Sequence, residues 1–282
     1  AMLGAGCAGA AAWPGAAAAP ASPPALINGA ALHLPLDRFL QTPPQAEAIA
    51  RAYRLLLAQC MDRFGIADPP REVSPDEPAT LNERRYGITD PVLASKAGYR
   101  VSTRAITDPP ARPAPPTGSS DPRTLDVLTG QHGQVLQGRT IPAEGCSGEA
   151  KRRLTAGAPA GTDISLAERL SQDSYFRSAR DRRVQAVFEA WSACMRTRDM
   201  RYPTPLGAAA DPRFRRGPVS TTEIAVAASD IDCKKKTNLV GVWFTVESEL
   251  QRPVLVRKRD ALDRVRRTNE AELKVARSLG LA

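Results

Sequence analysis

The stretch "QAVFEAWSACMRTRD" (185–199) decides the fold because the chain uses its pattern twice, and the earlier copy is "RAYRLLLAQCMDRFG" (51–65). In each copy apolar residues recur at helical spacing, and a Cys-Met pair stands near the C-terminal end. A proline-rich exit follows each copy, "ADPP" after the first and "RYPTP" after the second. The repeat predicts a helical chain built from two similar halves.

The N-terminal stretch has no charged residue before Asp37 and consists largely of Gly, Ala and Pro. Such a composition buries too little apolar surface to offset chain entropy, so we expect residues 1–36 to be a disordered tether. Within it, "LGAGCAG" around Cys7 is similar to the end of a bacterial lipoprotein signal peptide, where small residues precede a cysteine that becomes acylated. Ordinary export with cleavage near "APA" (19–21), or a cysteine of no consequence, are the alternatives.

Four further cysteines read as disulfides, because an even count in an exported chain is typical of them. Each Cys-Met segment is followed at a distance by a second cysteine. Treating the chain as two similar halves favours the sequential pairing Cys60–Cys146 and Cys194–Cys233, although four cysteines allow three connectivities. A metal site is the rival interpretation, but neither a C-x-x-C spacing nor a nearby His supports it, and we expect no metal and no cofactor.

Helix signals dominate after residue 40, and no clear alternating strand pattern occurs. Thr42 and Asp90 are expected N-caps, while "SLAE" (165–168) and "STTE" (220–223) read as capping boxes. From Ser220 the helical signal runs almost to Leu279, with interruptions expected near 238–241 and at Pro253. The sequence predicts an all-α, irregular, disulfide-stapled helical fold with a long C-terminal helix and a disordered N-terminal arm.

The chain divides into three parts by composition. After the tether of residues 1–36, we expect an N-terminal helical half over 37–160 that contains a proline-rich loop at 103–124. A C-terminal helical half follows over 161–282.

The net charge of +9 and the isoelectric point near 9.7 favour an anionic neighbour. Solvated helix faces, or cations that complement a helix dipole, are the ordinary alternatives. Nucleic acid is not expected as a partner, because the interleaved aromatics of single-strand binders and any known motif are missing from the sequence. The candidate binding residues are Lys234, Lys235, Lys236, Arg257, Arg264, Arg266 and Arg267.

The sequence offers little catalytic equipment. Its only histidines are His33 and His132. The segment "QHGQVLQGRTIPAEGCSGEAKRR" (131–153) places His132 upstream of Cys146 and faintly resembles the active-site segment of L,D-transpeptidases, which cross-link peptidoglycan through a Cys thiolate paired with His. The family's second His is Glu144 here, and a carboxylate beside the sulfur disfavours a thiolate. We therefore expect a disulfide at Cys146 and no enzyme activity. Acidic pairs at 230/232 and 247/249 carry no clear catalytic signal.

Several segments together resemble a group of exported actinobacterial proteins, many of them lipoproteins. They are "LGAGC", "QCMDRFG", "NERRYGITDP", "EGCSGEAKRRL", "AWSACMRTRDMRYPTP" and "DCKKKTNLVGVWFTVE", followed by an Arg-rich terminal helix. "CMRTRDMRYPTP" also looks like a motif of secreted actinobacterial proteins in which a later helix supplies the second cysteine. That resemblance implies Cys233 as the partner of Cys194, and it brings no reaction with it.

These observations predict a non-catalytic cell-envelope lipoprotein with a binding or accessory role for an envelope or transport system. Its expected location is extracytoplasmic, either secreted or attached to the outer face of the cell membrane. A lipid anchor on Cys7 would hold it at the membrane surface, and an anionic wall polymer or an envelope protein is a further candidate partner. The alternative is a cell-wall-modifying enzyme of the L,D-transpeptidase type that uses Cys146.

Overall fold

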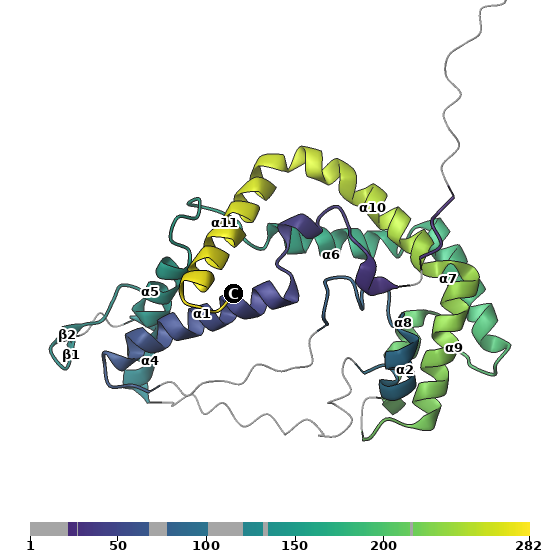
Figure 1. Cartoon of the computed structure of the whole chain (residues 1–282), viewed down its shortest axis with the longest axis horizontal. Helices are drawn as coiled ribbons and strands as arrows, with labels where there is room; N and C mark the ends of the chain where they lie inside the picture. The colour runs from purple at the N-terminus through teal and green to yellow at the C-terminus, as the bar shows by residue number, and fades with distance from the viewer. Residues whose placement is uncertain (1–21, 27, 68–77, 101–120, 132–134, 215–216) are drawn as a thin grey trace, which may run out of the picture.

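In the computed structural model the two longest C-terminal helices form the two arms of an arch, and shorter helices gather at the foot of each arm (Figure 1). The structure describes residues 22–26, 28–67, 78–100, 121–131, 135–214 and 217–282. Its elements are η1 (Gly29–Ala31), η2 (Asp37–Phe39), α1 (Pro43–Asp62), α2 (Pro91–Ala97), α4 (Pro122–Thr129), β1 (Val135–Leu136), β2 (Arg139–Thr140), α5 (Gly145–Leu154), α6 (Leu166–Ser178), α7 (Arg182–Arg196), α8 (Pro205–Ala209), η3 (Pro212–Phe214), α9 (Thr221–Thr237), α10 (Leu239–Arg257) and α11 (Arg259–Ser278).

The predicted helical class is confirmed. Strand structure in the described residues is limited to β1 and β2, two residues each, which pair antiparallel with Val135 opposite Thr140. Asp90 caps α2 by accepting hydrogen bonds from the backbone N–H groups of Val92 and Leu93, as expected. Thr42 likewise starts α1 with a capping box completed by Gln45.

Each foot of the arch contains one disulfide. Cys60 of α1 is bonded to Cys146 of α5, and the bond lies among buried residues of α1, α4 and α5. Cys194 of α7 is bonded to Cys233 of α9 at the other foot. The sequential pairing predicted from the repeat is therefore confirmed. The alternative of a metal site at these cysteines is wrong, because each of the four sulfurs is bonded in one of the two disulfides.

The second foot carries the larger apolar core. The side chains of Trp191 on α7 and Trp243 on α10 are completely buried. Phe188 packs edge to face against Trp243, and the ring of Tyr86 packs on it at a tilt. Both indoles have a hydrogen-bond partner: Trp243 Nε1 donates to Ser178 Oγ at 2.9 Å, and Trp191 Nε1 donates to Asp230 Oδ1 on α9 at 2.9 Å. This aromatic centre fixes α6, α7 and α9 around α10.

The prediction of a disordered tether over residues 1–36 is wrong for its second part. Leu32, Leu34 and Leu36 are buried, and Gly29 donates its N–H to Thr89 Oγ1 at 2.9 Å. The N-terminal segment also approaches α10 closely at Gly241, because a Cβ atom at this position would lie 1.9 Å from the carbonyl oxygen of Pro24. The prediction rested on the average composition of residues 1–36 and overlooked the alternating leucines of "LHLPL" (32–36). Residues 1–21, including Cys7, lie outside the described residues.

The expected boundary near residue 160 does not separate two bodies. α2, from the predicted N-terminal half, packs along α9, and α1 and α5 pack against α11. The predicted loop at 103–124 ends earlier than expected, because α4 begins at Pro122 with Asp121 as its N-cap. Residues 103–120 of that loop lie outside the described residues. The two sequence halves are interleaved in space because each foot contains helices from both.

Two details of the C-terminal helices differ from expectation. The break predicted at Pro253 falls at Lys258 instead, since α10 continues through the proline and Leu255 packs on the buried Leu36 and Leu262. Ser220 caps α9 as predicted, but Ser165 makes no side-chain cap for α6 because its hydroxyl bonds to Asp163. None of the helices in the described ranges is long and apolar enough to cross a bilayer.

The disulfides should contribute measurably to stability, because each closes a long loop, 86 residues apart in sequence for Cys60–Cys146 and 39 for Cys194–Cys233. We expect C60S/C146S to lower the free energy of unfolding by about 2–4 kcal/mol in denaturant titrations. The matched control is C7S, which removes a thiol and leaves both bonds intact. An unchanged unfolding midpoint in C60S/C146S would contradict this assignment.

Candidate functional site

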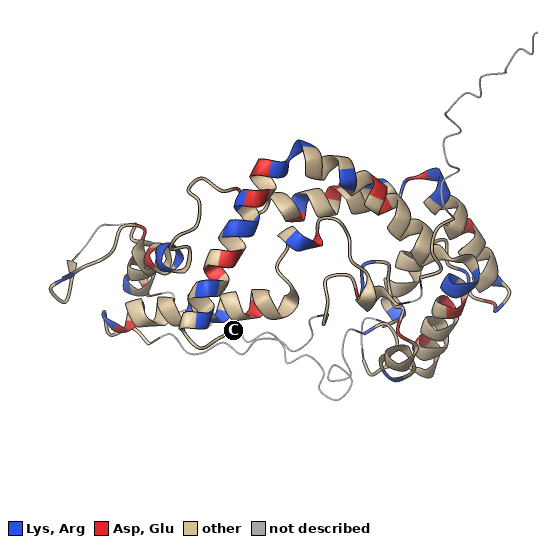
Figure 2. Ribbon diagram, turned by 45° about the horizontal axis from the view of Figure 1, so that its top comes forward, with Lys and Arg blue, Asp and Glu red and all other residues tan. Residues whose placement is uncertain are grey.

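The bend between α10 and α11 gathers exposed cations at the top of the arch. Figure 2 shows lysine and arginine at this bend, where α10 ends at Arg257, Lys258 leaves helical geometry with φ −113° and ψ 17°, and α11 begins at Arg259. Every residue from 256 to 260 is exposed. We call Arg252, Val256, Arg257, Lys258 and Arg259 the basic corner.

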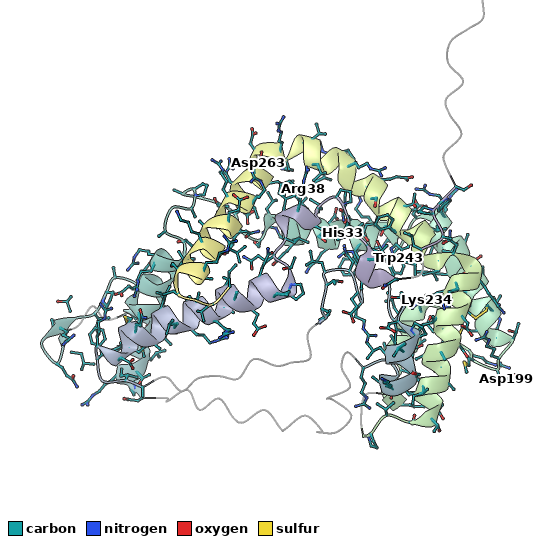
Figure 3. The ribbon with its side chains drawn as sticks, viewed as in Figure 1. His33, Arg38, Asp199, Lys234, Trp243 and Asp263 are labelled. Carbon is teal, nitrogen blue, oxygen red and sulfur yellow. A yellow bond between two sulfur atoms is a disulfide. The ribbon has the colours of Figure 1, made fainter. Side chains whose placement is uncertain are left out.

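Apolar contacts on the inner side of the bend hold the basic corner in place. Leu255 of α10, together with Leu262 and Val265 of α11, packs on Leu36 and Phe39 from the N-terminal segment. Figure 3 labels Arg38 of η2 and Asp263 of α11, the two elements that meet beneath the bend. Because these inner residues alternate with charged ones at helical spacing, Arg252, Val256 and Arg257 are turned to the outside.

The basic corner has a net positive charge. None of its four cations forms an ion pair with a residue that the structure describes, and Asp260 is the only carboxylate in the exposed run. Arg266, two turns along α11, instead contacts both Asp263 and Glu270. Arg257 and Lys258 stand at the C-terminus of α10, where the helix dipole favours positive charge. This arrangement can bind an anionic surface or polymer.

The sequence-predicted binding residues do not form one site. Arg257 belongs to the basic corner and Arg267 is exposed nearby on α11, whereas Arg264 is half-buried and Arg266 is held by two acids. Lys235 and Lys236 are exposed in the last turn of α9, and α10, which rises about 27 Å from Leu239 to Arg257, separates them from the basic corner.

Lys234 is wrong as a surface-binding residue, because its side chain is buried at 3% exposure. Its ammonium donates to Asp230 Oδ2 at 3.0 Å and to the Ile88 carbonyl at 2.9 Å (Figure 3). Asp230 also accepts hydrogen bonds from Trp191 Nε1 and Tyr99 OH. Burial raises the pKa of the Asp230 carboxyl and lowers that of the Lys234 ammonium, while attraction between the two charges offsets part of each shift.

The acidic pairs noted in the sequence do not act together. Asp230 faces the buried Lys234, whereas Asp232 is exposed and contacts Arg198. The same division holds on α10, where Glu247 is fully buried and Glu249 contacts Arg183 at the surface. Each carboxylate therefore has a structural cation partner.

The disulfide expected at Cys146 is observed, so the alternative of a nucleophilic thiol there is not supported. Cys146 is completely buried and bonded to Cys60, so its sulfur is not a free nucleophile. Its proposed partner His132 lies outside the described residues.

Sequence analysis missed most of the basic corner. Arg252, Val256, Lys258 and Arg259 were not among the candidate residues. The signal was the run "VRKRD" (256–260), whose single apolar residue among cations fits no inward-facing pattern. It was missed because a continuous helix beyond Pro253 would spread these residues around its circumference, whereas the break at Lys258 exposes them together.

No protein-family model, curated protein or solved structure matches this chain. The resemblances to exported actinobacterial proteins and to L,D-transpeptidases therefore remain predictions from the sequence. The function has to be argued from the charges, burial and bonds of the structure itself.

Replacing Lys234 tests whether the buried ion pair is structural. K234M should lower the free energy of unfolding by about 3–5 kcal/mol, because it leaves the carboxylate of Asp230 buried without its counter-charge. The matched control K235M alters the adjacent exposed lysine and should shift stability by about 0.5 kcal/mol or less. Equal losses in both variants, measured by urea unfolding, would contradict a buried pair.

Proposed function

We propose that the protein is a non-catalytic binding protein of the cell envelope, with an accessory role for an envelope or transport system. The observation that carries the proposal is the basic corner, where four exposed cations have no ion-pair partner among the described residues. Net positive charge on an exposed helix bend attracts an anionic component of the envelope and speeds encounter with it. The ligand class proposed is therefore an anion-rich polymer or surface.

The two disulfides support the compartment named in this proposal. Bonds of this kind persist in oxidising, extracytoplasmic environments and are rare in reducing ones. Cys7 lies outside both bonds, and its acylation is the proposed means of attachment to the outer face of the membrane. A tether of this kind raises the effective concentration of the basic corner near envelope anions, so that modest intrinsic affinity suffices.

The alternative, a cell-wall enzyme with Cys146 as nucleophile, gains no support from the geometry. A cysteine enzyme needs a thiolate with access to substrate and a base beside it. Cys146 is instead fully buried in a disulfide. A binding role requires only the surface charges described above.

Charge reversal at the basic corner tests the proposal. Poly(glycerol phosphate), a soluble polyanion, serves as the probe, and its binding to the full chain is measured by calorimetry at low and high salt. We expect R257E/K258E/R259E to weaken binding at least tenfold at low salt, which corresponds to about 0.5 kcal/mol for each reversed charge. High salt should weaken binding of the wild-type protein, because it screens the charges.

The matched control is K235E/K236E, which reverses two exposed lysines in the last turn of α9, beyond the far end of α10. It should retain more affinity than the corner variant. Wild-type protein that binds neither the polyanion nor anionic lipid vesicles, or equal losses in the two variants, would refute the proposed role of the corner.

A further inference from the structure

The basic corner carries an apolar tip. Val256 has 79% of its surface exposed, more than any other large hydrophobic residue in the described chain. Pro253, one helical turn earlier on the same face, is also exposed. An exposed valine contributes nothing to binding a soluble polyanion, whereas a ligand with both apolar and anionic parts would use it together with the four cations.

The shape of the molecule brings this tip to the outside. The α10–α11 bend forms the convex edge of the arch, so a flat surface can reach it without meeting the feet (Figure 1). The long side chains of Arg252, Arg257 and Arg259 can keep their aliphatic stems beside Val256 while their guanidinium groups reach outward. A bilayer interface offers the matching arrangement, with anionic headgroups outside and acyl chains beneath.

We infer that the α10–α11 corner docks onto the surface of an anionic lipid bilayer, with Val256 inserted at the headgroup boundary and the four cations on lipid phosphates. This inference rests on the proposed function and names its ligand. It assigns the anionic partner to lipid rather than to a wall polymer, because only lipid rewards burial of Val256. The contact is peripheral and depends on electrostatic attraction together with a small apolar area.

The test is co-sedimentation of the full chain with vesicles of phosphatidylglycerol and phosphatidylcholine in equal amounts, beside vesicles of phosphatidylcholine alone. Wild-type protein should bind the mixed vesicles at low salt and pass over the neutral ones. V256S should weaken partitioning about fivefold, since it removes the inserted apolar group. R257E/K258E/R259E should weaken partitioning about a hundredfold or more.

The matched control is V92S, because Val92 is likewise exposed, at 61%, but lies on α2 away from the bend. It should partition like the wild type. V256W supplies an independent readout: its added fluorescence should shift to the blue and be quenched by brominated lipid, and V92W should show neither effect. Urea unfolding of each variant checks that these surface changes leave the fold intact.

The outcomes separate this inference from the proposed function. If V256S and the wild type partition equally, or if V256W is not quenched, insertion is refuted. If the protein binds poly(glycerol phosphate) but not mixed vesicles, the partner is a wall-type polymer, so the lipid inference fails and the proposed function stands. If it binds neither probe, both fail.

Discussion

The ion pair and hydrogen bonds that enclose the carboxylate of Glu247 are the interactions on which the rest of the structure depends. This carboxylate is fully buried in the middle of α10, and a buried charge is tolerated only when it is paired and hydrogen-bonded. Arg85 Nε lies 3.1 Å from both of its oxygens, and Tyr86 OH donates at 2.8 Å. Ser174 Oγ and Gln251 Nε2 complete the shell at 3.0 and 3.1 Å. These partners come from α6, from α10 itself and from the segment before α2, so satisfying one carboxylate joins parts of the chain that are distant in sequence.

The same cluster extends to the N-terminal segment and so to the basic corner. Gln251 Oε1 accepts the backbone N–H of Leu36 at 3.0 Å, which places that leucine under the α10–α11 bend. Leu262 of α11 packs on the same leucine, and the bend is thereby held at the angle that turns Val256 outward. The geometry of the basic corner is thus linked to a polar network in the interior, since the position of the exposed residues depends on the buried ones.

Local patterns in the sequence predicted local structure well. Cap residues such as Asp90 predicted where helices begin, because capping acts within a few residues. The Cys-Met repeat predicted both disulfides, because it divides the chain into two similar halves with two cysteines each. Apart from the disulfides, contacts between residues distant in the sequence were not predicted. Nothing near Lys234 shows that Ile88 and Asp230 enclose it, and nothing near Leu36 shows that it meets α10. Burial of a charged residue depends on which distant segment covers it, and that information lies in the packing. The basic corner was not predicted for the same reason, since its cations form one surface only when the chain bends at Lys258.

The most direct test of this account is the free energy of unfolding of E247Q, measured by urea titration beside E249Q. Glu249 lies two residues away and meets Arg183 at the surface, so E249Q should cost about 1 kcal/mol or less. E247Q leaves Arg85 largely buried without its counter-charge, and the account predicts a loss of about 3–5 kcal/mol. Equal stability of the two variants would contradict the central role of Glu247.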